Sequence, residues 1–352
     1  MDTHCSDPNT PGLPQMPFTP PGGQMPYAPV PPTRRSGAGW KIFFGIVLGL
    51  SMLANAMLLA VVFAVVAVFS ASSRSMVDEA VVRQGPASNK IAVVSIAGMI
   101  AGDQADYFHR QIEAARKDKA VKGVIIRVNS PGGTIAASDR IYNEIRMFRK
   151  ECSKPVVAFM EALAASGGYY ASVACEKIIA EPTTITGSIG VISWYFAMQE
   201  LLEDKLGIVP VVVTGGEKKD WPSSFRVPTE EQRQYLQERL ITPAYERFVQ
   251  VVIDGRKGVL AEPEVRKLAD GSIYTAELAL AEKLIDRVGY LDDAIDVVKS
   301  MAKVKEVRVV EYRRPFTMSA LLRGQESMSL KVDKMLIHEL SRPELMYLWS
   351  AF

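Results

Sequence analysis

The sequence predicts an α/β domain that follows a single transmembrane helix. Residues 42–69 form a run of 28 residues without a charged side chain, and roughly 20 apolar residues are enough to cross a bilayer. Beyond residue 90, short runs rich in β-branched residues alternate with helix-like stretches, which is typical of βα units with mostly parallel strands. Three of the turns that follow such runs combine serine with glycine, and these turns carry the prediction of function.

The N-terminal residues 1–39 are rich in proline and poor in aliphatic side chains, so they cannot bury enough surface to offset the entropy of ordering. Arg34, Arg35 and Lys41 precede the apolar run, whereas Arg74 follows it and is itself followed by Asp78 and Glu79. By the positive-inside rule we expect a single-pass protein of the cell membrane, with a cytoplasmic N-terminus and an extracytoplasmic main domain. The expected domains are a disordered tail at 1–39, the transmembrane helix at 40–70, a spacer at 71–89, the main domain at 90–303 and a C-terminal extension at 304–352.

Composition excludes several classes of function. The 352 residues include 48% hydrophobic and 23% charged side chains, and their net charge is +2. A nucleic-acid-binding protein usually carries a marked basic excess on one domain, so nucleic acid is not expected as a partner. The three cysteines form no CxxC pair, and no HExxH sequence is present. The sequence therefore offers no zinc-ligand set, and no metal or cofactor is expected.

Histidine is scarce, since the chain contains only His4, His109 and His338. None of them stands beside a turn of the kind that presents a nucleophilic serine, so each is expected to be a surface residue. A Ser-His-Asp triad therefore has no evident base. A hydrolase built on this sequence needs a different base.

Five β-rich runs are expected to form strands: Ile91–Ile96, Val124–Val128, Val156–Met160, Ile178–Ala180 and Ile208–Val213. A helix after the second run is indicated by Ile141, Ile145 and Phe148, which fall on one helical face. A later helix is expected to begin at Thr229, where Gln232 completes a capping box. Pro243 is expected to kink that helix.

The first of the three turns is Asn-Ser-Pro-Gly-Gly at 129–133, directly after a predicted strand. Two glycines at this place let backbone N–H groups point into a cleft and hold an anion. Taken alone, the motif is also an ordinary turn.

The second turn is Ala-Ala-Ser-Gly-Gly-Tyr-Tyr at 164–170, again between a strand and a helix. Small residues around Ser166 permit a tight turn that exposes the hydroxyl, and the N–H of Gly167 is placed to donate to an oxyanion. In isolation Ser166 is equally well explained as a helix N-cap. The third turn, Thr-Gly-Ser-Ile-Gly-Val at 186–191, is by itself an ordinary loop.

The three turns occur in this order, and each follows a predicted strand. Together they resemble the turns of the signal peptide peptidase A family of bacterial membrane peptidases. The resemblance covers about residues 90–300 and rests on VNSPGG (128–133), AASGGYY (164–170), TGSIGV (186–191), EKKD (217–220) and ADGSIYTAELALAEKLID (269–286). It implies the spiral ββα fold shared with the Clp protease proteolytic subunit and the crotonases. It also implies a membrane-anchored serine endopeptidase that degrades remnant signal peptides or other hydrophobic polypeptides.

The resemblance implies a Ser-Lys dyad, with Ser166 as nucleophile and Lys219 as general base. Ser188 is implied to orient the lysine, and the oxyanion hole is implied to combine Gly167 with Gly132 or Gly133. A solvated lysine has a pKa of about 10.4, so a lysine base has to be desolvated to be neutral at physiological pH. Trp221, Pro222 and Phe225 stand near Lys219 and are expected to provide apolar cover.

Strand direction gives a separate argument about the lysines. Lys154 precedes the strand that leads to Ser166, and a helix of about nine residues carries Lys177 ~13 Å away from that serine. Lys219 follows the run Ile208–Val213, which in a parallel sheet is the serine's end. Lys218 lies there too, and position does not exclude it. The family motif, with the base directly before an aspartate, favours Lys219, although two consecutive lysines depart from the usual motif.

Two other classes of function remain open. A crotonase-type acyl-CoA enzyme shares the fold and the first glycine turn, but it normally lacks both a transmembrane anchor and a serine on the second turn. A catalytically inactive membrane scaffold keeps the fold without turnover, and the presence of both Ser166 and Lys219 counts against it.

The expected partners are peptide substrates, the lipid bilayer and further copies of the chain. Tandem members of the family carry the lysine in the first half and the serine in the second. A single-repeat chain is therefore implied to act as a ring-like homo-oligomer that shares each dyad between neighbours. Ser166 and Lys219 of one chain are then expected to lie beyond hydrogen-bond reach.

Cys152 and Cys175 flank the strand and helix that carry Ser166. The strand leads to Ser166 and the helix that follows runs back in the opposite direction, so both cysteines are expected at the same edge of the sheet. A disulfide between these residues is therefore one hypothesis. The other is that each cysteine packs independently as a small hydrophobe.

Overall fold

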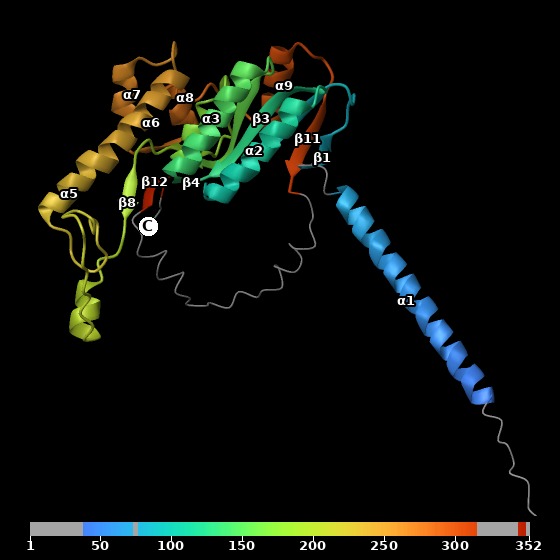
Figure 1. Cartoon of the computed structure of the whole chain (residues 1–352). Coiled ribbons are helices and arrows are strands. Elements are labelled where there is room, and N and C mark those ends of the chain that lie inside the picture. Colours follow the sequence, from blue (N-terminus) through green and yellow to red (C-terminus); the bar gives the residue numbers. More distant parts are fainter. Residues whose placement is uncertain (1–37, 73–76, 315–343, 350–352) are drawn as a thin grey trace, which may run out of the picture. The chain divides into compact units, whose positions relative to one another are not determined.

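The computed structural model describes residues 38–72, 77–314 and 344–349 (Figure 1). The chain divides into two compact units, Met1–Val68 and Phe69–Phe352. The described part of the first unit belongs to helix α1 (Ala38–Ser72), whose stretch Gly39–Val65 has a mean hydropathy of 2.4 and no buried part. This helix agrees with the apolar run that predicted a membrane anchor. The tail expected at 1–39 lies almost wholly outside the described residues.

The second unit is organised around a nine-stranded sheet with the order β1-β11-β2-β3-β5-β6-β10. The strands from β11 to β10 are parallel, whereas β1 is antiparallel to β11. A short strand, β7, continues beside the end of β5 and pairs with β9. The bounds are β1 Asp78–Arg83, β2 Lys90–Ala97, β3 Val121–Ser130, β5 Val156–Ala165, β6 Lys177–Ala180, β7 Ile185–Gly187, β9 Ile273–Thr275, β10 Arg287–Val288 and β11 Arg308–Arg313.

Four of the five expected strands are therefore present, as β2, β3, β5 and β6. The sheet also extends into the flanking segments. Strand β1 lies in the expected spacer 71–89, and β11 lies in the expected extension 304–352. A second sheet of three antiparallel strands contains β4 (Gly132–Thr134), β12 (Glu344–Leu348) and β8 (Ile192–Trp194), with β12 in the middle.

Helices cover both faces of the main sheet. Along β2, Ala92 and Val94 join the larger apolar cluster, whereas Ile91 and Val93 join a second cluster on the other face. This alternation is why the central strands consist almost entirely of apolar residues. Helices α2 (Gly102–Lys117), α3 (Ile135–Glu151), α4 (Gly167–Ser172), α6 (Thr242–Gly255), α7 (Glu262–Leu268) and α8 (Ala276–Ala281) contribute to the larger cluster, and α9 (Leu291–Ala302) contributes to the second.

The helix predicted at Thr229 begins there. The Thr229 hydroxyl accepts from the Gln232 N–H, and the Gln232 side chain accepts from the Thr229 N–H, which completes the capping box of α5 (Glu230–Leu236). The chain then continues through a π-helical segment, η2 (Gln237–Ile241), into α6. Pro243 stands in the first turn of α6, where a missing N–H is tolerated.

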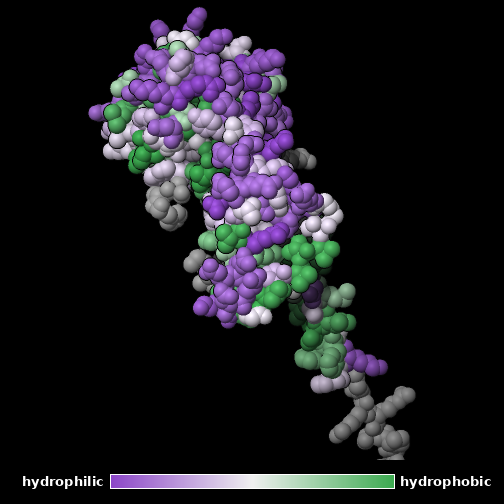
Figure 2. Space-filling view, turned by 90° about the vertical axis from the view of Figure 1, so that its left-hand side faces the viewer, coloured by the Kyte–Doolittle hydropathy of each residue, from purple (hydrophilic) through white to green (hydrophobic). Residues whose placement is uncertain are grey.

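Between β8 and α5 the chain forms an arm that projects from the domain and contains the π-helical segment η1 (Leu201–Lys205) (Figure 1). The strand predicted at Ile208–Val213 is wrong, since these residues are irregular. Val211 is 84% exposed and Val213 is 91% exposed. A strand needs a neighbouring strand for its backbone hydrogen bonds, and no strand of the described part of the chain pairs with this segment. Figure 2 shows hydrophobic patches on the arm, whereas the domain above it is largely hydrophilic.

The two domain cysteines are not bridged. Cys152 and Cys175 are both free thiols, and Cys175 is buried in the larger cluster. Burial raises the pKa of the Cys175 thiol, which keeps it protonated and unreactive. The structure therefore favours the hypothesis that each cysteine packs as a small hydrophobe.

One buried ion pair joins the end of α6 to the strand edge. The Arg256 side chain, only 4% exposed, donates to Asp286 at 3.0 Å and to the Lys283 carbonyl at 2.9 Å. Asp286 also accepts from the Ile178 N–H at 2.8 Å. Burial alone would raise the pKa of Asp286, but the charge and hydrogen bond of Arg256 outweigh it and hold this pKa below its ordinary value.

We expect Asp286→Asn to lower the free energy of unfolding by about 3 kcal/mol at neutral pH, because it leaves the Arg256 charge buried without its counter-ion. The folded-state pKa is the lower one, so this stabilisation is present above about pH 4 and is lost as the pH falls through the folded-state value. Urea unfolding of the full chain in detergent at several pH values measures it.

The matched control is Asp292→Asn, which removes an exposed partner of Arg83. A change below about 0.5 kcal/mol is expected there. Equal losses in the two variants would contradict the structural role of Asp286.

Candidate active site

Ser166 stands in a strained turn between β5 and α4. Its backbone has φ 52° and ψ −114°, a left-handed conformation that residues with a Cβ rarely adopt. The Ser166 N–H donates to the Gly187 carbonyl at 2.8 Å, and its carbonyl accepts from the Tyr170 N–H at 2.8 Å. The residue is 1% exposed, and its hydroxyl has no hydrogen-bond partner among the described residues. A buried hydroxyl without a hydrogen bond lowers the stability of the folded state unless a ligand or a partner supplies that bond.

Ser188 lies beside Ser166 because of strand register. In the parallel pairing of β5 with β7, Ala165 is opposite Gly187, so the next residues of the two strands are the two serines. Ser188 also has positive φ, at 51°, and its N–H donates to the Ser272 carbonyl at 2.7 Å. It lines an open cavity of about 480 Å³. Two predicted site residues are thus brought together.

The first glycine turn is held open by Ser130. The Ser130 hydroxyl donates to the Gly98 carbonyl at 2.6 Å and accepts from the Gly132 N–H at 3.0 Å. Gly132 has φ +101°, which favours glycine. Of the two glycines expected as alternatives for an oxyanion hole, Gly132 therefore has its N–H already engaged.

A carbonyl oxygen already occupies the space between the two glycine turns. In the antiparallel pairing of β4 with β12, Tyr347 is opposite Gly133. A Cβ added to Gly132 would lie 2.0 Å from the Tyr347 oxygen and 2.7 Å from the Gly167 nitrogen, and one added to Gly167 would lie 3.1 Å from the same oxygen. The absence of side chains on these glycines therefore makes room for a carbonyl beside Ser166.

Lys219 is not part of this arrangement within one chain. It lies on an exposed turn of the arm, where its N–H donates to the Gly216 carbonyl at 3.1 Å. The Ser166 hydroxyl has no partner in the described structure, so no hydrogen bond joins it to Lys219. The apolar cover expected from Trp221, Pro222 and Phe225 does not bury this lysine within one chain, since Lys219 is exposed. The Trp221 ring instead contacts the Lys218 ammonium, which lies 4.8 Å from the ring centroid.

The other lysines considered from the sequence have structural partners. Lys154 donates to the carbonyls of Ala115 and Asp118 at the end of α2, and Lys177 pairs with Asp286 at 3.2 Å. Lys218 lies 4.8 Å from the Tyr235 ring centroid and 4.0 Å from Glu231. His109 contacts Glu144 on the surface; His4 and His338 lie outside the described residues.

Sequence reasoning missed the part of the site that β12 supplies. Tyr347 lies far along the chain from the three glycine turns, and it stands in a short, continuous apolar run at 345–349 that by itself does not identify a strand. It also missed the role of Ser130. No cluster of three or more potential metal ligands is present among the described residues.

Comparison with known proteins points to one family. A family model described as peptidase family S49 matches residues 149–305, and a Clp protease model matches residues 85–184. The putative signal peptide peptidase SppA of Enterococcus faecium is 37% identical over 252 residues, which are 68% of this chain and 72% of that protein.

Two further relatives bear names of the same kind. A putative protease of Methanocaldococcus jannaschii is 37% identical over 59% of this chain and 65% of its own length. Protease 4 of Haemophilus influenzae is 34% identical over 63% of this chain and 36% of its own length. This chain therefore spans only about a third of protease 4. The Clp protease model and the observed sheet together show the Clp protease-like α/β fold.

The strained backbone at Ser166 predicts that glycine is more stabilising than alanine at this position. We expect Ser166→Gly to be more stable than Ser166→Ala by about 1 kcal/mol, because glycine adopts positive φ without strain. Urea unfolding of both full-length variants in detergent measures the difference.

Ser300 in α9 is the matched control. There the order should reverse, with glycine less stable than alanine by about 1 kcal/mol. The same order at both sites would show that Ser166 carries no special backbone conformation.

Proposed function

Because the chain belongs to peptidase family S49 and is a serine peptidase, we propose that it cleaves peptides with Ser166 as nucleophile and Lys219 as general base. The observation that carries the proposal is the buried Ser166 hydroxyl, which has no partner among the described residues and lies beside two glycine turns that enclose a carbonyl oxygen. Ser188 is the residue that orients the lysine.

The chemistry requires one proton acceptor and one anion site. The Ser166 oxygen attacks the peptide carbonyl carbon while its proton passes to the lysine nitrogen. The N–H groups of Gly133 and Gly167 stabilise the negative oxygen of the tetrahedral intermediate. The protonated lysine then gives its proton to the leaving amine, and a water molecule hydrolyses the acyl-enzyme through the same base.

We propose further that the lysine comes from a neighbouring chain of a ring-like homo-oligomer. Within one chain Lys219 is exposed on the arm, while Ser188 lines an open cavity next to the nucleophile. The irregular run Ile208–Val213 precedes Lys219 and exposes β-branched side chains. Such a segment gains both burial and backbone partners when a second chain adds to it. Desolvation in the neighbour's cleft is what would make the lysine a base.

The membrane anchor supports a substrate class. An apolar helix that spans the bilayer holds the domain close to the surface, and the flanking charges favour a cytoplasmic N-terminus and an extracytoplasmic peptidase domain. Remnant signal peptides and other hydrophobic polypeptides released at the membrane are the proposed substrates. The bilayer thus serves as the place where enzyme and substrate meet.

We expect Ser166→Ala and Lys219→Ala each to reduce kcat/KM for a peptide substrate by at least about 10³-fold, because the dyad acts as a unit. Lys218→Ala and Lys177→Ala are the matched controls and should retain activity. A fluorophosphonate probe should label the wild type but not Ser166→Ala. Full activity of Lys219→Ala would refute the dyad, and labelling that does not depend on Ser166 would favour a scaffold or an acyl-CoA enzyme.

Sharing of the dyad predicts complementation. When the inactive Ser166→Ala and Lys219→Ala chains are unfolded, mixed in equal amounts and reassembled, about a quarter of the sites should receive an intact serine and a neighbour's intact lysine. Recovered activity of that order is the expected result. Mixtures that stay inactive, while wild-type chains treated in the same way recover, would place both residues in one chain.

A further inference from the structure

A second serine near the Ser166 turn has a buried hydroxyl without a hydrogen bond. Ser138 lies in the first turn of α3 and is completely buried, and its side-chain oxygen has no partner among the described residues. A buried serine in a helix can donate to the carbonyl four residues earlier, as Ser172 of α4 does to Gly168 at 2.8 Å. Ser138 makes no such bond. Because alanine at this place would avoid an unsatisfied hydroxyl, the serine points to a use other than stability.

The Ser138 hydroxyl lies against the glycine that follows Ser166. A Cβ added to Gly167 would be only 2.5 Å from the Ser138 oxygen, so this oxygen packs directly on the Gly167 backbone. In the described part of the chain, the serine hydroxyls that are buried without a partner are those of Ser95, Ser138 and Ser166. Two of these three therefore adjoin Gly167, the residue whose N–H is a proposed oxyanion donor.

The same point is next to the place of a carbonyl oxygen. The position of a Gly167 Cβ is 3.1 Å from the Tyr347 oxygen, which lies between the two glycine turns. The Ser138 hydroxyl and that oxygen are therefore neighbours across the space that Gly167 leaves empty. No hydrogen bond joins them, because the Ser138 oxygen has no partner. A donor that stands near this place without bonding a neutral carbonyl is suited to an interaction made only in the transition state.

We propose that Ser138 is a third donor of the oxyanion hole, in addition to the backbone N–H groups of Gly133 and Gly167. When the Ser166 oxygen adds to the substrate carbonyl carbon, the carbonyl oxygen becomes negative and leaves the plane of the former peptide bond. The Ser138 hydroxyl turns its hydrogen toward this oxygen and keeps its own proton. Burial strengthens the attraction, because little solvent screens it. The proposal rests on the proposed peptidase function and adds a catalytic residue to it.

The surroundings of Ser138 favour a negative oxygen. Helix α3 begins directly after β4, and the N-terminal end of a helix carries partial positive charge. The carboxylate next in sequence, Asp139, accepts from the Tyr170 hydroxyl at 2.5 Å and from the Arg247 guanidinium at 2.9 Å. These partners hold Asp139, so it does not take the Ser138 hydroxyl.

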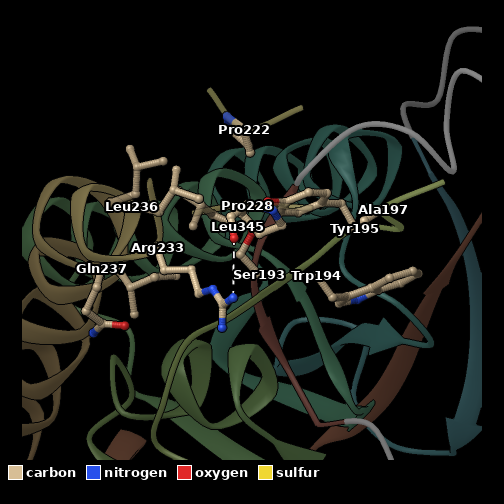
Figure 3. A pocket seen from close by; sticks show the side chains of 12 residues that line it. Ser193, Trp194, Tyr195, Ala197, Pro222, Pro228, Arg233, Leu236, Gln237 and Leu345 are labelled. Carbon is tan, nitrogen blue, oxygen red and sulfur yellow. Dashed lines mark hydrogen bonds between the residues drawn. The ribbon is translucent and has the colours of Figure 1, made fainter. Parts of the chain in front are cut away.

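Ser138 lines neither of the two cavities on this side of the molecule that can hold side chains of a peptide. Figure 3 shows one of them, of about 450 Å³, with Tyr195 and Leu236 among its lining residues. The other is the cavity of about 480 Å³ beside Ser188, which is also lined by Tyr245. Loss of the Ser138 hydroxyl should therefore change the reaction of a bound peptide and leave its binding intact.

The first test compares kcat and KM of full-length variants in detergent. We expect Ser138→Ala to lower kcat for a peptide substrate by about 10- to 100-fold and to change KM by less than about twofold, because only the tetrahedral state gains from the hydroxyl. Ser172→Ala is the matched control, since it removes an equally buried serine hydroxyl that is bonded within its own helix. Its kcat should stay within about twofold of the wild type. A wild-type kcat in Ser138→Ala, or equal losses in both variants, would overturn the proposal.

The second test uses the rate of labelling by a fluorophosphonate probe. The Ser166 oxygen bonds to phosphorus as fluoride leaves, and the negative oxygen on phosphorus takes the place of the oxyanion. Labelling of Ser138→Ala should therefore be slower by the same factor of about 10 to 100. Ser138→Cys keeps the shape of the side chain but offers only a weak donor, so it should be slowed as well. It decides the question if the alanine variant does not fold. Labelling at the wild-type rate in a folded variant contradicts the third donor.

Urea unfolding separates this role from a structural one. The Ser138 hydroxyl is unsatisfied in the fold, so the urea midpoint of Ser138→Ala should equal or exceed that of the wild type. Ser172→Ala loses an existing hydrogen bond, and its midpoint should fall. A fall of the same size in both variants would show that Ser138 is bonded in the folded protein, against the proposal.

The peptidase mechanism and the third donor fail separately. Cleavage that persists in Ser166→Ala refutes the proposed mechanism and with it the role of Ser138. Cleavage that needs Ser166 but keeps the wild-type kcat without the Ser138 hydroxyl refutes the third donor alone.

Discussion

The parallel pairing of β5 with strands on both of its sides is the constraint on which the site depends. At its C-terminal end, Ala164 is opposite Ser130 of β3 and also opposite Thr186 of β7. Three turns far apart in the sequence therefore meet at one edge of the sheet. The bond from the Ser166 N–H to the Gly187 carbonyl extends this ladder into the turn itself. With the backbone held from both sides, Ser166 keeps a left-handed conformation that it would leave if it were free.

The same edge of the sheet explains the place of β12. Strands β4 and β8 pair with the two edges of β12 in a second, three-stranded sheet, and both are antiparallel to it. The facing edges of β4 and β8 carry unpaired backbone groups when β12 is absent, and such groups favour the addition of a strand. The Tyr347 carbonyl oxygen lies close to Gly132 and Gly167 only because neither residue has a side chain in the way. The position of β12 and the room beside Gly167 are thus consequences of one geometry.

The arm differs from the rest of the domain in how it exposes apolar side chains. The domain buries its apolar residues on both faces of the sheet, whereas the arm exposes most of the side chains of Val209, Val211 and Val213. Exposure of this kind is unfavourable in an isolated chain. In the proposed homo-oligomer, contacts with a neighbouring chain would bury these side chains. The same contacts would bring the proposed base to the neighbour's serine, because the base and the interface belong to the same segment.

Much of the fold and half of the site were predictable from the sequence because they depend on local patterns. The uncharged run at 42–69, the apolar strands around β5 and the capping box at Thr229 follow from residue spacing alone. The three glycine turns pointed to Ser166, Ser188 and Gly167, and the structure brings these residues together. The run Ile208–Val213 has strand composition, but no described strand pairs with it, and composition cannot supply a partner. The position of β12 depends on which edges the folded domain leaves open, so only the tertiary structure could decide that the Tyr347 carbonyl lies close to Gly132 and Gly167.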